Sequence, residues 1–440
     1  MFGPGVCQIN SRGWETPQHA SSIRRVGSLS RGSGLEQKLP PQVFSDKVFM
    51  PCHIFRVANH GGGKTMMLAH KIRIYPNNEQ ETYLKKSCGV ARFAYNWALA
   101  HSIEQYKQNK DYKFSEASLR KELNSIKREE YPWMLEVSKC APQLAIKNGL
   151  NNAFKRFFKK QGGYPNFKRK GIRDSFQLDN LNIKLTGKAV KLPLLKQPIK
   201  MAEELKYTNA KILSATVSRR ADQWYISIQV ELESPKPKHT TVSENQAIGV
   251  DLGITDLAVL SNGEKITGSK HTKKYAKQLR RNQQFLSRKK GSKKGEKTSN
   301  NYIKQRLKVS RLHKKMADSR IDELHKLSTY LTDNFGLIGL EDLNIEGMVK
   351  NHNLSKSIHD QSWGEFKRQI EYKAKITGSR IVYADRFFPS SQLCSSCGYQ
   401  NKEVKNLAIR GWICPECGAI HDRDINAAIN LKNLALRNIA

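Results

Sequence analysis

The sequence is short of acidic residues and has no long apolar segment. Asp and Glu total 39 against 76 Lys and Arg, so the net charge is +37 and the pI is near 9.9. No stretch reaches the roughly 18 apolar residues of a membrane span, and no signal-peptide hydrophobic region is visible. We therefore expect a cytoplasmic, nucleoid-associated protein that is not secreted and has no membrane partner. A positive surplus of this size opposes compact folding unless a polyanion neutralises it, which favours a nucleic-acid partner.

Cysteine is also scarce, with eight in the chain. Four of these are scattered without a pattern, which excludes a disulfide-rich scaffold: Cys7, Cys52, Cys88 and Cys140. The other four form two Cys-x-x-Cys pairs: Cys394, Cys397, Cys414 and Cys417. Two such pairs at this spacing are typical of a zinc ribbon, and four thiolates leave no open position for catalysis. We expect one structural Zn²⁺.

The positive charge is concentrated in two stretches. The denser one, 270–320, contains only Glu296 and Asp318 as acids, and its apolar spacing predicts long helices with the basic side chains on a separate face. The other, 155–170, interleaves basic residues with aromatic ones on a Gly/Pro loop, which suits a nucleic-acid backbone and base stacking by Tyr164 or Phe167. The expected phosphate contacts are Lys155, Arg156, Lys159, Lys160, Lys168, Arg169, Arg280, Arg281, Arg288, Lys289, Arg306 and Arg311.

Three separated carboxylates are the most informative residues that remain. Asp251 follows the apolar run 247–250, Glu341 follows the apolar run 337–340, and Asp424 opens a helix-like segment. Carboxylates at two strand ends and one helix start can converge on one point. A phosphodiester-cleaving site with two Mg²⁺ ions requires such a convergence.

Two of these acids have a close competitor. Strand alternation places Glu341, and not Asp342, on the face shared with Leu337 and Gly339. Asp422 competes with Asp424 in the same way, and spacing alone leaves both choices open.

Four motifs, in this order, closely resemble the TnpB family, transposon-encoded proteins related to type V CRISPR effectors. They are Gly249-Val-Asp-Leu-Gly253, Gly339-Leu-Glu-Asp-Leu343, Phe387-Phe-Pro-Ser-Ser391 and Asp422-Arg-Asp-Ile-Asn-Ala-Ala428. The resemblance covers the chain from about Met67 onward. It implies a RuvC-type nuclease of RNase H-like fold whose Asp, Glu and Asp match Asp251, Glu341 and Asp424.

The resemblance further implies a multidomain α/β protein whose partners are a guide RNA from the transposon end and target double-stranded DNA. The protein would be monomeric with its RNA and would cut next to a short adjacent motif. The implied parts are a wedge β-barrel (67–78 and 166–240), a helical recognition domain (79–165), the RuvC-like nuclease (246–393 and 418–440) and the zinc ribbon (394–417). We expect residues 1–66 to be a disordered leader.

Two alternatives remain beside an RNA-guided endonuclease. One is a DNA-binding regulator whose carboxylates do not cut, and the other is a transposase that joins DNA ends. The phosphate-loop-like run Ala58 to Thr65 is not expected to bind ATP, because a strand-like segment follows it instead of a helix.

Overall fold

The computed structural model describes residues 57–60, 63–207, 209–240, 243–268, 271–289 and 299–439. Met50–Ala440 forms one compact unit, whereas the expected leader up to residue 56 lies outside the described residues. The prediction that disorder extends to residue 66 is wrong, because Val57–His60 pairs antiparallel with the start of Gly63–Tyr75 and Met66 is buried. A hairpin, with no helix after it, therefore occupies the phosphate-loop-like run.

The first sheet has eight strands and is built around the long strand β2, which pairs with β8 along most of its length and with β6 at its end. The strands are β1 (Val57–His60), β2 (Gly63–Tyr75), β3 (Ser175–Asp179), β4 (Lys184–Thr186), β5 (Ala189–Lys191), β6 (Ile199–Met201), β7 (Lys211–Arg220) and β8 (Gln223–Glu233). The strand order of this sheet is β3-β7-β8-β2-β6-β5-β4, with β1 beside β2. The hydrogen bonds between the described strands therefore link them in an open row and do not close the row into a ring.

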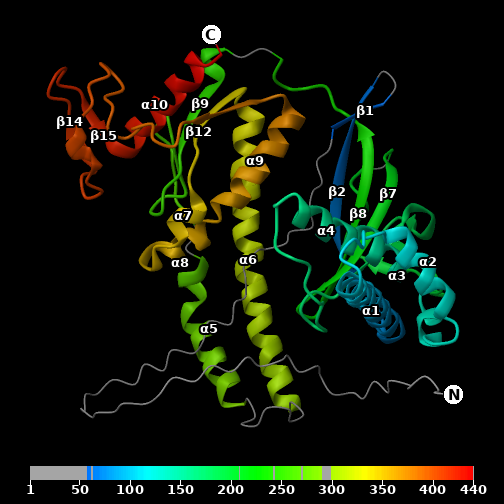
Figure 1. Cartoon of the computed structure of the whole chain (residues 1–440). Helices are drawn as coiled ribbons and strands as arrows, with labels where there is room; N and C mark the ends of the chain where they lie inside the picture. The colour runs from blue at the N-terminus through cyan, green and yellow to red at the C-terminus, as the bar shows by residue number, and fades with distance from the viewer. Residues whose placement is uncertain are drawn as a thin grey trace, which may run out of the picture. The chain divides into compact units, whose positions relative to one another are not determined.

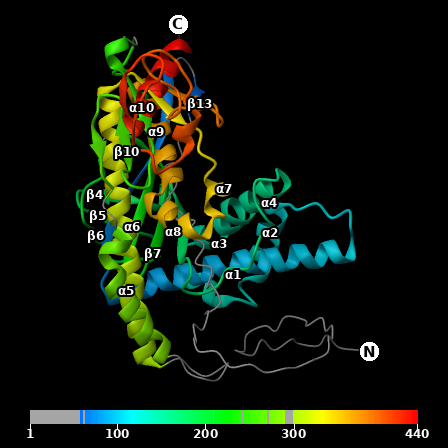
Figure 2. The ribbon, with the colours of Figure 1, turned by 90° about the vertical axis from the view of Figure 1, so that its left-hand side faces the viewer.

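Helices interrupt this sheet between β2 and β3. Asn77 starts the first of them with a reciprocal capping box to Gln80 directly after Pro76. The helices are α1 (Asn78–Gln108), α2 (Glu116–Ile126), α3 (Cys140–Leu144) and α4 (Asn151–Phe158), with one π-helical turn at Ala145–Leu150. They share one hydrophobic core with the sheet, and Figure 2 shows the length of α1. Phe154 of α4 is buried in this core.

The second sheet has five strands in the order β11-β10-β9-β12-β13. The three strands β9, β12 and β13 run parallel, while β10 is antiparallel to both β9 and β11. Their bounds are β9 (Ala247–Asp251), β10 (Ala258–Leu260), β11 (Lys265–Ile266), β12 (Leu337–Glu341) and β13 (Arg380–Ala384). Both apolar runs predicted as buried strands are confirmed, and each strand ends on its acid.

The helices of this part of the chain are α5 (His271–Arg288), α6 (Asn300–Asn334), α7 (Ile345–Val349), α8 (His352–Gln361), α9 (Trp363–Thr377) and α10 (Arg423–Arg437). Of these, α6 and α9 pack on one face of the sheet and α10 on the other. Ile248, Val250, Ile338 and Leu340 pack with leucines of α6 and with Phe366 of α9 on one face. The alternate residues Ala247 and Leu337 face α10 instead, and Figure 1 shows α10 beside β9 and β12. The two long basic helices predicted between residues 270 and 320 are α5 and α6.

Two glycines let α10 lie directly on the sheet. Gly249 and Gly339 are register partners on the parallel strands β9 and β12. A Cβ atom at Gly249 would lie 1.8 Å from the carbonyl oxygen of Ala428, and one at Gly339 would lie 2.3 Å from that of Leu431. Only a residue without a side chain permits this approach, so the glycine two residues before each acid sets the height of α10 above the sheet.

Replacing Gly249 with Ala is expected to lower the thermal midpoint of the nuclease part by roughly 5 °C, because the new methyl group pushes α10 away from the sheet. Gly364→Ala is the matched control, since its Cβ would meet Ile345 Cδ1 at an ordinary 3.8 Å. Thermal melting of both variants measures the difference. An unchanged midpoint for Gly249→Ala would contradict this close contact.

In the described part of the chain, no helix combines the length and the apolar character that crossing a bilayer requires.

Candidate nuclease site and cysteine cluster

The alternation of the two central strands places Asp251 and Glu341 on one face of the sheet. Residues 247, 249 and 251 share a face of β9, and residues 337, 339 and 341 share the corresponding face of β12. This is the face that contacts α10, because Gly249 and Gly339 meet its backbone there. Since Leu340 is paired with Val250, the two acids lie at the same edge of the sheet, one residue further along each strand.

The helix α10 brings the third acid to this edge. Its backbone passes Gly249 at Ala428 and Gly339 at Leu431, and Ala435 packs with Ala247 and Leu337. The helix therefore runs antiparallel to both strands, with its first turn over the strand ends. Asp424 lies in that first turn, so the structure brings together the three acids that the sequence singles out.

The three carboxylates interact electrostatically. Burial, together with the negative charges of Glu341 and Asp424, raises the pKa of Asp251 well above its usual value. Burial also raises the pKa of Glu341, although a hydrogen bond from Ser390 opposes this rise. Clustered carboxylates of this kind favour a bound cation, because a cation offsets their mutual repulsion. Their oxygen ligands suit a hard divalent ion such as Mg²⁺.

The competing acids have other roles. Asp342 faces away from α10 and accepts a hydrogen bond from Lys367 of α9 at 3.0 Å, and this ammonium holds the pKa of Asp342 below its usual value. Asp422 caps α10 by accepting from the backbone N–H groups of Asp424 and Ile425, and it pairs with Lys265 at 2.6 Å. The choices of Glu341 and Asp424 therefore agree with the geometry.

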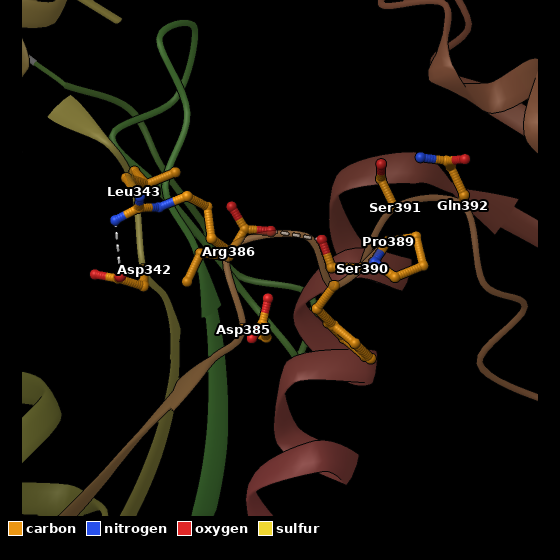
Figure 3. A pocket seen from close by; sticks show the side chains of 10 residues that line it. Asp342, Leu343, Asp385, Arg386, Pro389, Ser390, Ser391 and Gln392 are labelled. Atoms are coloured by element: carbon orange, nitrogen blue, oxygen red, sulfur yellow. Dashed lines mark hydrogen bonds and ion pairs between the residues drawn. The ribbon is translucent and has the colours of Figure 1, made fainter. Parts of the chain in front are cut away.

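A polar pocket of about 200 Å³ opens beside Glu341. The loop after β13 supplies most of its lining, and Figure 3 shows Arg386 turned toward Asp342, with Ser390 on the other side of the pocket. The Ser390 hydroxyl donates to a carboxylate oxygen of Glu341, and the Ser390 carbonyl accepts from Asn430 of α10 at 2.8 Å. Ser390 thus links Glu341 to the helix that carries Asp424.

Two asparagines of α10 fix the chain that leads into the first cysteine pair. Asn426 accepts from the backbone N–H of Ser395 and donates to the carbonyl of Leu393, which also accepts from Asn430. The sequence reasoning assigned no role to these side chains. Their spacing of four residues, which places both on one helix face, is the signal that could have found them.

The four cysteines predicted as zinc ligands lie together, with their sulfur atoms all within 4.8 Å of one another. Two short antiparallel strands, β14 (Gly411–Ile413) and β15 (Ile420–Asp422), flank the second cysteine pair and form a small ribbon. The second of them, β15, leads directly into α10. Hydrogen bonds from the backbone and from His421 lower the pKa of the Cys394 thiol to about 5, even though burial opposes its ionisation. Four cysteine sulfur atoms held this close together fit a structural Zn²⁺.

This cysteine cluster is joined to the acids through β15. His421 contacts the sulfur of Cys394 at 3.0 Å, its neighbour Asp422 caps α10, and Asp424 follows within the first turn. The guanidinium of Arg410, also in the ribbon, donates to Asp424 at 3.1 Å. The nearby positive charges of Arg410 and Arg423 oppose the rise in the pKa of Asp251. Neither His421 nor Arg423 is among the site residues that the sequence predicts.

All twelve residues predicted to contact phosphates have exposed side chains. Four of them already contact other residues. Arg156 donates to the carbonyl of Gln161 at 3.2 Å, and the guanidinium of Arg281 lies 5.6 Å from the centre of the Phe285 ring. Arg311 pairs with Asp222, and the ammonium of Lys168 lies 3.9 Å from the centre of the Tyr95 ring. Burial of that ammonium lowers the pKa of Lys168 to about 8, although the residue as a whole is exposed. Lys168 is therefore better suited to fixing its loop on α1 than to gripping a phosphate.

The chain matches three family models. One, described as "Probable transposase" (OrfB of IS605), matches residues 227–352. A model described as "Cas12f1-like, TNB domain" matches 363–431, and a model of the OrfB helix-turn-helix domain matches 66–111.

Curated relatives resemble the chain over most of its length. A Streptomyces pristinaespiralis protein named "Putative RNA-guided DNA endonuclease" is 37% identical over 82% of this chain and 88% of its own. The Escherichia coli K12 protein "Putative RNA-guided DNA endonuclease InsQ" is 31% identical over 82% of this chain and 91% of its own. Among solved structures, a Cas12f1 chain in a complex with single guide RNA and target DNA has a TM-score of 0.52 at 13% identity, covering 84% of this chain and 99% of that one.

Proposed function

Because the chain belongs to the TnpB (IS605 OrfB) family, we propose that it is an RNA-guided DNA endonuclease that hydrolyses phosphodiester bonds of target DNA at the Asp251, Glu341 and Asp424 site. The observation that carries the proposal is the convergence of these three acids at one edge of the second sheet. The strand order of the second sheet, in which β10 runs antiparallel to β9, supports an RNase H-like, RuvC-type nuclease domain.

The three carboxylates would hold two Mg²⁺ ions. When bound, such ions activate a water nucleophile and stabilise the leaving oxygen of the scissile phosphate. Ser390 holds one oxygen of Glu341, which fixes the direction of its carboxylate. Arg410 and Arg423 supply positive charge beside Asp251, so a phosphate approaching this acidic edge meets attraction as well as repulsion.

The basic helices and the 155–170 stretch would bind nucleic-acid backbones. Arg280, Arg281 and Arg288 are exposed on α5, Lys289 is exposed directly after it, and Arg306 is exposed on α6. Such contacts set affinity and salt dependence but do not select a sequence. Sequence would be selected by pairing between guide RNA and target, while the protein reads a short adjacent motif.

We further propose that residues 67–78 and 166–240 are the wedge domain, 79–165 the recognition domain, 246–393 and 418–440 the nuclease, and 394–417 a zinc ribbon. The interruption of the first sheet by α1 to α4 supports this division. The guide would come from the transposon end, and the protein would work as a monomer with its RNA in the cytoplasm, on nucleoid DNA.

Programming the guide tests the proposal. The purified protein with its RNA and Mg²⁺ is expected to cut only duplexes that match the spacer beside the correct motif, and a new spacer should move the cut accordingly. Mismatches next to that motif should stop cutting, because pairing starts there before it extends outward. Denaturing gels of labelled duplexes measure the products, and RNA-free protein is the control.

Other outcomes would favour the two alternatives. Guide-dependent binding without any cut would indicate a regulator, and joined DNA ends would indicate a transposase. Sequence-specific cutting by RNA-free protein would overturn the role of the guide.

A further inference from the structure

The most exposed large apolar side chain among the described residues lies next to the nuclease site. Phe387 is 87% exposed and stands between Arg386 and Phe388, which both line the pocket beside Glu341. From this position we infer that Phe387 is a positioning residue, which stacks on an unpaired base of the target strand and so holds the scissile phosphate at the acids. The inference rests on the proposed function, and it adds a residue that holds the DNA strand in the nuclease site.

The loop that presents Phe387 is held firmly relative to Glu341. The side-chain carboxylate of Asp385 accepts a hydrogen bond from the backbone N–H of Phe387 at 3.0 Å. The backbone carbonyl of Asp385 accepts one from the backbone N–H of Phe388, also at 3.0 Å. The carbonyl of Phe388 accepts from the backbone N–H of Ser390, whose hydroxyl donates to Glu341. The backbone that carries the ring is therefore preorganised, so stacking of a base has to order only the side chain of Phe387.

The chemistry around the ring fits a nucleic-acid strand. Arg386 and Lys367 lie on the same side of the site, where both pair with Asp342, and they add positive charge near the pocket. A polyanion with aromatic bases satisfies both features, because its phosphates meet the cations while a base covers the ring. Stacking tolerates every base, which suits an enzyme whose sequence choice is made by guide pairing.

Single-turnover cleavage by the full-length protein with its guide RNA tests the role. Phe387→Ala and Phe387→Leu are expected to cut about tenfold more slowly, the size of effect that loss of one base–aromatic stack gives, whereas Phe387→Trp should cut at close to the original rate. Leu407→Ala, which changes an exposed apolar residue of the zinc ribbon, is the matched control and should cut normally. Thermal melting should be unchanged in all four.

A stacking-sensitive probe separates loading from folding. With 2-aminopurine placed at successive positions of the target strand in the Asp251→Asn background, one position should be quenched by Phe387 and should brighten in Phe387→Ala. Target binding by gel shift should not change. If the unmodified protein cuts but Phe387→Ala cuts equally fast and no position brightens, the inference is overturned while the proposed function stands. If the unmodified protein does not cut at all, the inference and the proposed function both fail.

Discussion

Replacing Asp251 with Asn is expected to reduce guide-directed cleavage by at least about 1,000-fold, or roughly 4 kcal/mol of transition-state stabilisation, while binding of RNA and DNA stays nearly unchanged. Glu341→Gln and Asp424→Asn should have the same effect, because all three acids would hold the catalytic ions. The basic residues that we propose bind nucleic acid lie elsewhere, on α5, on α6 and in the 155–170 stretch. Cleavage rates and gel shifts on the same preparations measure the two properties separately.

The neighbouring acids provide matched controls. Asp342→Asn removes a charge that faces α9, and Asp422→Asn keeps a side chain that can still cap α10, so both variants should retain most cleavage. Normal cutting by Asp251→Asn, or complete loss in Asp342→Asn, would show that the acids are wrongly assigned.

The same Asp251→Asn variant has an expected effect on stability. Since burial and the neighbouring carboxylates raise the pKa of Asp251, its charge opposes folding in metal-free protein at neutral pH. This opposition disappears as the pH falls and the carboxyl takes up a proton. Metal-free Asp251→Asn should therefore melt at a temperature no lower than the unmodified protein at pH 7, which distinguishes a catalytic loss from a folding defect.

Removal of the metal from the cysteine cluster is expected to have the second-largest effect. Cys414→Ser should lose the single bound zinc and unfold the ribbon, because the binding energy of structural zinc, about 10–16 kcal/mol in small zinc-finger peptides, is also folding energy. Since β15 leads directly into α10, Asp424 should lose its position and cleavage should fall with the zinc content. Elemental analysis and hydrogen exchange of α10 measure the two changes.

Cys88→Ala is the control for this variant, because Cys88 is buried in the core of the first sheet, away from the cluster. It should keep one zinc per chain and full cleavage. Full zinc occupancy in Cys414→Ser would show that the cluster is not a zinc site. Loss of zinc with intact cleavage would show instead that α10 keeps its place without the ribbon.

The acids and cysteines could be predicted because their positions follow from local patterns. Alternation in the strand favours Glu341 over Asp342 without settling the choice, and two Cys-x-x-Cys pairs predict a four-sulfur cluster that the structure assembles. Asp424 could be chosen only through family resemblance, since its competition with Asp422 depends on which carboxylate caps α10. That capping is a matter of backbone geometry, which spacing does not record.

Interactions between distant segments could not be read from the sequence. The contacts of Asn426 and Asn430 with the chain before the cysteines, and that of Arg410 with Asp424, join side chains whose partners are set by the packing of α10. The contact between the Lys168 ammonium and the Tyr95 ring could not be predicted either, because the sequence of a basic loop does not show which amine turns inward. The early start of β2 was missed because its partner β1 lies in a segment without clear periodicity.

The distribution of the three acids along the chain also orders events during protein synthesis. Asp251 and Glu341 leave the ribosome on strands that can pair as soon as β12 is complete, whereas Asp424 arrives only with α10, after all the other helices that the structure describes. Domains generally fold as they emerge, from the N-terminal side first. A nascent chain can thus assemble its nucleic-acid-binding elements before it has a complete set of acids, so the ability to cut is acquired last.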